Sequence, residues 1–210
     1  MILLSTAYFP PVSWMALLVQ NNGEASVELH ETYSKQSYRN RFVIATSHGK
    51  MSLSVPVIKP KGNKTKTNEI IIDYSENWQQ VHWRSLKAAY QSSPFFIYYA
   101  DDIEAIINEK YEYLYQLNEK IIKKLLAILG VEYQIKNTSD FVAVNTHEND
   151  YRFLIHPKQN SLMDSEGYEQ VFEEKNGFIA DLSVLDLIFN LGPEALLYLQ
   201  DAKFLEKSNK

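Results

Sequence analysis

Three side chains that can form hydrogen bonds follow one another at helical spacing: Trp78, His82 and Tyr90, with Leu86 between the last two. Steps of four residues place them along one stripe of a helix. A histidine with a pKa of about 6.5 can transfer protons at neutral pH. His82 is therefore a candidate general base, and Tyr90 is a candidate binding residue. The alternative is a core histidine whose imidazole is hydrogen-bonded within the protein.

A second group of polar side chains leads into a β-rich run and includes Tyr33, Lys35, Asn40 and Arg41. The guanidinium of Arg41 offers a planar fork to a carboxylate or phosphate, and the amide of Asn40 both donates and accepts hydrogen bonds. We expect Arg41 to hold an anion with the help of Lys35 and Asn40. Tyr33 is a candidate catalytic residue that lines or polarises the site. An ordinary surface strand is the alternative.

Two further candidates, Asp186 and Asn190, lie near the end of the chain. Ser183 fits the N-cap of a helix and Asp186 falls three residues later, which makes a variant capping box. Asn190 comes just before Gly192 and Pro193, which close the helix. Helix boundaries explain most of this pattern, and Asp186 and Asn190 remain as candidate substrate-binding residues.

A basic segment lies between the second of these groups and the first. Its glycine and proline content is typical of a solvated loop, and the alternative is a flap that collects anions. The segment contains Lys59, Lys61, Lys64 and Lys66.

The composition excludes several classes of protein. The net charge of −5 argues against nucleic-acid binding, and the absence of cysteine excludes disulfides and cysteine-dependent sites. The five histidines show no pair at ligand spacing, and the common nucleotide-binding and hydrolase motifs are absent, so we expect no metal and no cofactor. No apolar run is close to about 18 residues long, the length that a membrane-spanning helix requires. The apolar N-terminus lacks basic residues and is interrupted by Pro10 and Pro11, so we expect a cytoplasmic protein.

The elements that position these residues predict a fold of the α/β class. A strand at 2–4, a helix at 11–19 and a strand at 27–30 form a β-loop-α-β opening, and ligands in such folds sit beyond the first strand, where Tyr8 lies. Period-two alternation predicts a hairpin from 42–46 and 51–57. The length of 210 residues fits one domain over 1–210, with a mixed β-sheet, packed helices and a helical C-terminal half; α+β is the alternative.

The remaining expected elements are mostly helical. Gly130 supplies the stop of the longest helix. We expect 203–210 to be a disordered tail. The expected strands are 70–72, 141–144 and 151–155, and the expected helices are 76–91, a short one from Asp101, 111–129, 168–174, 183–190 and 194–199.

Taken in order along the chain, these segments resemble the WbqC-like family of bacterial proteins. The resemblance covers roughly residues 2 to 200. One departure is that family members commonly carry His-Gln-Pro before the Tyr-x-Pro turn, where this chain has Ser5-Thr6-Ala7. The matching positions are Tyr8-Phe9-Pro10, Asn40-Arg41, Val55-Pro56, Trp78 with His82 and Tyr90, Pro94-Phe95-Phe96, Tyr168 with Gln170, and Leu182-Ser183 with Asp186, Phe189, Asn190 and Gly192.

The resemblance implies a group transferase acting on an anionic or sugar-linked small molecule. Family members occur among O-antigen and other surface-polysaccharide genes, and glycine or aminoacyl transfer is the activity suggested for some of them. In such an enzyme Arg41, Lys35 and Asn40 would hold the anion, His82 would be the base, and Tyr8 and Tyr33 would line the site. The competing hypothesis is a non-catalytic small-molecule-binding or scaffold protein of envelope biogenesis. The sequence leaves the oligomeric state open.

Overall fold

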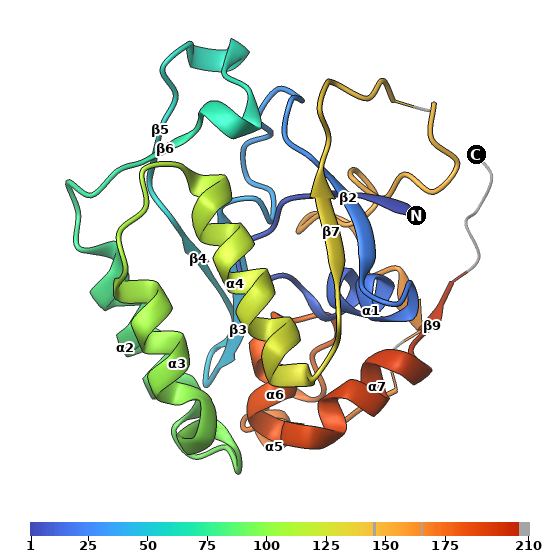
Figure 1. Ribbon diagram of the computed structural model, residues 1–210. Coiled ribbons are helices and arrows are strands. Elements are labelled where there is room, and N and C mark those ends of the chain that lie inside the picture. The colour runs from blue at the N-terminus through green and yellow to red at the C-terminus, as the bar shows by residue number, and fades with distance from the viewer. Residues whose placement is uncertain (145, 165, 206–210) are drawn as a thin grey trace.

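The first two strands of the chain belong to a three-stranded parallel sheet with the strand order β1-β2-β7 (Figure 1). The computed structural model describes residues 1–144, 146–164 and 166–205. Its strands are β1 (Ile2–Ser5), β2 (Glu24–Glu28) and β7 (Gln134–Asn137), and helix α1 (Val12–Gln20) connects the first two. This β-α-β unit places the carboxyl ends of all three strands at one edge, which is where ligands bind in α/β proteins.

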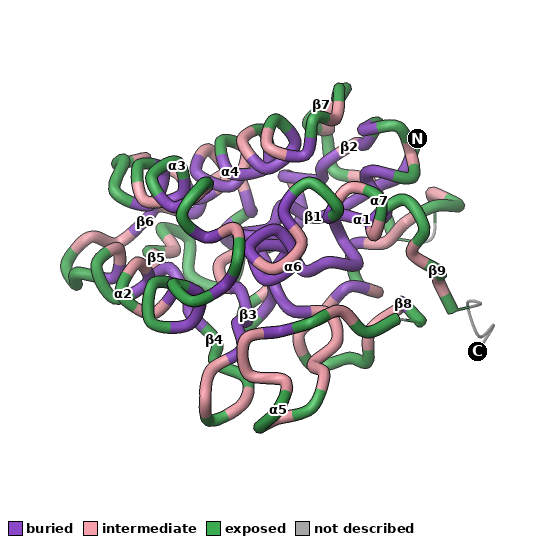
Figure 2. Tube along the Cα trace, turned by 90° about the horizontal axis from the view of Figure 1, so that it is seen from below, coloured by how far each residue is buried: buried purple, intermediate pink, exposed green. Residues whose placement is uncertain are grey.

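Helix α1 lies inside the protein, because it is apolar on every side. All of its residues except the last are buried, as expected for a helix without a polar face. It contacts α6 (Val184–Leu191) and α7 (Ala195–Asp201). Figure 2 shows that α6 is itself buried over most of its length at the middle of the molecule.

A hairpin of β3 (Arg41–Thr46) and β4 (Gly49–Ser54) packs against the same core. Alternation places Phe42 and Ile44 on its core face, while Arg41 and Val43 share the other face. After the hairpin, the short strands β5 (Val57–Ile58) and β6 (Ile71–Ile72) enclose the basic segment, which contains the 3-10 turns η1 (Gly62–Lys64) and η2 (Thr67–Glu69).

Three helices form the middle of the chain: α2 (Trp78–Tyr90), α3 (Phe96–Asn108) and α4 (Leu114–Leu129). Neighbouring members of this group contact each other, as Figure 1 shows. The C-terminal third contains β8 (Met163–Asp164), α5 (Glu173–Asn176), η3 (Gly192–Glu194) and β9 (Lys203–Phe204).

The α/β class, the hairpin and most helices are confirmed, with the helix ends shifted by a few residues. Parallel and antiparallel strands occur in separate sheets. Gly130 ends α4 in the left-handed conformation (φ 69°), as expected. The strand expected at 27–30 lies at Glu24–Glu28, and the helix expected from Asp101 begins at Phe96.

The strands expected at 141–144 and 151–155 are wrong. Backbone groups of the first segment bond to side chains instead: the Val142 N–H donates to Glu28 (2.8 Å), and its carbonyl accepts from Arg152 (2.9 Å). The third strand of the sheet is β7, which the sequence did not reveal because it pairs with residues far away in the chain.

Two expectations for the C-terminal third are also corrected. The helix expected at 168–174 is only the single turn α5, because the Gln170 side chain bonds both backbone groups of Ile179 and holds a loop. In the expected disordered tail, Lys203 and Phe204 pair with β8. Residues 206–210 of that tail lie outside the described residues.

Candidate functional site

Buried polar side chains gather where the parallel strands end. Thr6 follows β1, Glu31 follows β2, and Asn118 reaches them from α4. The Asn118 amide donates to the Thr6 hydroxyl (3.1 Å) and to the carbonyl of Arg39 (2.8 Å). The carboxyl edge of the sheet is therefore polar inside the protein, as in a ligand-binding α/β fold.

Two buried arginines at this edge are neutralised by carboxylates. Arg39 Nε donates to Glu31 (2.9 Å), and Arg152 forms a fork with Asp150 (2.9 and 2.5 Å) and lies 3.7 Å from Glu28. Burial raises the pKa of Glu31, while Arg39 acts in the opposite direction. Because these guanidinium groups already have carboxylate partners, they are structural rather than available to a ligand.

Arg41, at the start of β3, differs from both. It is half-buried, its Nε is shielded from solvent without a hydrogen-bond partner, and within the described residues it takes part in no ion pair. Tyr33 lies close enough for Arg39 and Arg41 to lower its pKa, although burial dominates and raises it to about 12. The phenol is therefore neutral at pH 7 and can donate a hydrogen bond beside Arg41.

His156 is a second neutral donor in this neighbourhood. Its Nδ1 accepts from the backbone N–H of Lys158 (3.2 Å), which leaves the proton of the neutral ring on Nε2. Burial lowers the pKa of His156, and Arg39, Lys158 and Arg41 lower it further. The sequence did not single out His156, because a lone histidine in a loop carries no periodic signal.

The basic segment also contributes to this neighbourhood. It runs beside the loop after β2, with the Tyr33 N–H donating to the Thr65 carbonyl (3.0 Å). Lys35 is exposed and Lys59 is half-buried, and the two ammonium groups meet, which lowers the pKa of Lys59. Lys61 pairs with Glu69 (2.5 Å). We call Tyr33, Lys35, Arg41, Lys59 and His156 the cationic site.

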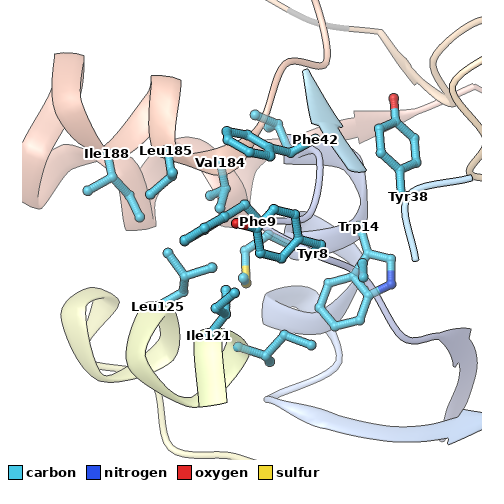
Figure 3. Packing of buried hydrophobic residues seen from close by; sticks show 14 of the residues in the cluster. Tyr8, Phe9, Trp14, Tyr38, Phe42, Ile121, Leu125, Val184, Leu185 and Ile188 are labelled. Carbon is cyan, nitrogen blue, oxygen red and sulfur yellow. The ribbon is translucent and has the colours of Figure 1, made fainter. Parts of the chain in front are cut away.

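His82 and Tyr8 are placed elsewhere, inside the aromatic core, where the imidazole packs against Phe42 and Trp78. Figure 3 shows Tyr8 within this core. The Tyr8 hydroxyl lies 3.0 Å from Nδ1 of His82, and the imidazole also bonds the carbonyl of Ser54. Because a carbonyl only accepts, the ring donates to Ser54 and accepts from Tyr8. Burial lowers the pKa of His82 to about 4, with the Ser54 carbonyl acting in the opposite direction. Ser54 pairs with Arg41 across the hairpin, so His82 supports the strand opposite Arg41.

The last predicted group forms a separate buried cluster. Oδ2 of Asp186 accepts from Tyr168 (2.6 Å) and Gln170 (2.9 Å), and Tyr90 lies beside the same carboxylate. Burial raises the pKa of Asp186, and these donors oppose the shift. Ser183 caps α6 through the Leu185 N–H (3.3 Å), as expected.

The remaining predicted residues divide between these places. Asn190 bonds the Asp186 carbonyl (2.8 Å) and lines a cavity of about 540 Å³ at the end of α6. Asn40 donates to the Val55 carbonyl (2.9 Å), and its buried Oδ1 has no partner in the described structure. Tyr33 therefore lies within electrostatic reach of Arg41, and Lys35 meets Lys59 of the basic segment. His82 and Asp186 belong to separate buried clusters.

The sequence profile of the WbqC-like protein family matches residues 6–161. The chain belongs to this family. It is also 27% identical over 194 residues to the uncharacterized protein Rv1507c of Mycobacterium tuberculosis, covering 80% of this chain and 84% of that protein. No solved structure matches the chain.

The stretch that matches the WbqC-like profile contains the whole cationic site, from Tyr33 to His156, and ends before Asp186. In the part of the chain that the structure describes, no three metal-binding side chains are arranged to hold an ion. No described helix has the length and apolar character needed to cross a membrane.

Proposed function

We propose that this WbqC-like protein binds a small molecule carrying a carboxylate or phosphate at the cationic site, as the substrate of a group-transfer reaction on a sugar-linked compound. The observation that carries the proposal is Arg41. Its guanidinium is half-buried, its Nε has no partner in the described structure, and Tyr33 and His156 lie within reach of its charge.

A partly buried cation without a counter-charge is unfavourable unless something compensates it. An anion would accept the Arg41 fork in the bidentate geometry that guanidinium favours. Tyr33 and His156 would add neutral hydrogen bonds, and the facing ammonium groups of Lys35 and Lys59 would attract the anion and lose their mutual repulsion. The site is thus built to receive negative charge.

Group transfer comes from the resemblance to the family, and the geometry supports its binding step. Holding one reactant rigidly by its anion is what a transferase requires of such a site. His82 has both hydrogen-bonding nitrogens occupied inside the core and a low pKa, so we assign it to positioning β4. Its role as a general base stays a prediction.

Thermal shift with anions and sugar phosphates tests the binding step. A ligand at 100 times its Kd stabilises the fold by about 2.7 kcal/mol, which raises Tm by roughly 5 to 11 °C for a chain of this size. We expect Arg41→Gln to abolish the shift. Arg84→Gln is the matched control, because Arg84 is an exposed arginine outside the site. Equal shifts in wild type and Arg41→Gln would refute the proposal.

A non-catalytic binding protein is the second candidate, and the enclosure of His82 favours it, since a general base works best with a pKa near the working pH. Mass spectrometry of the bound ligand, incubated with candidate acceptors, separates the two. A transferase changes the mass of ligand and acceptor, whereas a binding protein returns the ligand unaltered.

A further inference from the structure

A cavity of about 340 Å³ lies over the same hairpin face that carries Arg41. Val43 lines it from β3, two residues beyond Arg41, and Lys50 lines it from β4. The segment that follows His156 runs across this face, with Pro157 and Ser161 on the cavity wall. His156 and Arg41 therefore stand at one end of the face and the cavity at the other.

The cavity lining has the chemistry of a site for hydroxyl groups. It combines the carboxylate of Asp181, the amide of Asn160 and the hydroxyls of Tyr38 and Ser161 with the apolar ring of Phe178. Figure 3 shows the Tyr38 hydroxyl directed away from the aromatic core. Ligand sites of this kind pair apolar surface with a few converging polar groups. Carboxylates and amides together match hydroxyls, which both donate and accept.

Asp181 is held rigidly at the cavity wall. Its oxygens accept from the Ser13 N–H (2.8 Å) and the Ser13 hydroxyl (2.9 Å), and its backbone adopts a left-handed conformation (φ 58°). Such a conformation is unfavourable for a residue other than glycine and is concentrated at functional sites. The Ser161 hydroxyl also bonds this carboxylate. A carboxylate has about four acceptor positions, so the bonds from Ser13 and Ser161 leave one for a ligand hydroxyl.

We propose that this cavity binds a neutral polyhydroxyl group, such as a hexose ring, of the same molecule whose anion Arg41 holds. Asp181 and Asn160 bond its hydroxyls, and Phe178 contacts its apolar face. Residues two apart on a strand are separated by about 6.6 Å, so one sugar linked to one phosphate or carboxylate spans Arg41 and the cavity. The inference rests on the proposed function and adds the substrate class to it.

Calorimetric titration with two probes, inorganic phosphate and a series of hexose 1-phosphates, tests the inference. In wild type we expect at least one hexose phosphate to bind at least about tenfold more tightly than phosphate, because the added hydrogen bonds to the Asp181 carboxylate and Asn160 amide strengthen binding. Asp181→Asn and Asn160→Ala should remove this advantage and leave the Kd for phosphate within twofold. Asn160 is exposed, so its variant keeps the fold.

The outcomes separate the two proposals. If hexose phosphates bind no more tightly than phosphate, or if both cavity variants keep the advantage, the sugar site is refuted while anion binding stands. If Arg41→Gln binds phosphate and hexose phosphates as wild type does, the proposed anion site fails and the sugar site fails with it.

Discussion

Burial keeps the imidazole of His82 neutral, and this has a consequence for stability. Its pKa is about 4 in the folded protein and about 6.5 when unfolded. Between these values the unfolded chain binds more protons, so the free energy of unfolding falls as the pH falls from about 6.5 to about 4. The loss attributable to this residue is up to about 3 kcal/mol.

Urea unfolding of wild type and His82→Asn at stepped pH measures this contribution. The difference between the two proteins isolates His82 from the carboxyl groups that titrate in the same range. We expect the difference in unfolding free energy to shrink as the pH falls through this window. A constant difference would show that His82 is not held neutral.

His156 makes a prediction of its own for ligand binding. Burial and then the neighbouring cations lower the pKa of His156 in the free protein, and a bound anion would raise it. Binding therefore takes up a proton, and affinity rises as the pH falls. Sulfate is a suitable probe because its charge is constant. We expect its Kd to fall between pH 8 and pH 5.5 in wild type and to change little in His156→Gln; equal pH dependence in both proteins would exclude His156 from the site.

At the scale of elements, the turn from α1 to β2 fixes how closely β7 approaches. Gly23 has φ 73°, and a Cβ there would lie 2.2 Å from the backbone oxygen of Glu132. Gly23→Ala must therefore strain the backbone and also push the residues before β7 away from β2. We expect it to destabilise the protein by at least about 2 kcal/mol.

Gly49→Ala is the matched control for Gly23→Ala in denaturant unfolding. Gly49 has φ 93° in the turn between β3 and β4, and nothing lies within 4 Å of a Cβ there. Gly49→Ala should lower the free energy of unfolding by about 1 kcal/mol, from backbone strain alone. If the two variants lose equal stability, the close contact between Gly23 and Glu132 does not hold the sheet together.

Elements whose signals are local were predictable from the sequence. The alternation in 42–46, the Gly130 stop and the Ser183 cap each depend on a few neighbouring residues, and each is present. Strand β7 was missed, because three of its four residues are polar and it becomes a strand only by pairing with β2.

In the candidate site too, the residues that are close in sequence could be predicted, and those that only the fold of the whole molecule brings near could not. Tyr33, Lys35 and Arg41 were predicted as one group because they are close in sequence. His156 joins them only through the fold, and Asp181 reaches the same hairpin face from near the end of the chain. The separation of His82 from Arg41 follows from strand alternation and helix packing, which spacing along the chain does not fix.

The turn after β1 is completed by residues far along the chain. The Val12 N–H donates to Leu182 (2.9 Å), the Val184 N–H to Pro10 (2.8 Å), and the Ser183 hydroxyl to Phe9 (3.0 Å), whose backbone is left-handed (φ 41°). At synthesis rates of about 5–20 residues per second, these partners leave the ribosome on the order of ten seconds or more after α1. During that interval α1 lacks its contacts with α6 and α7. We expect chaperones to bind this apolar helix in a chain that is still too short to contain α6.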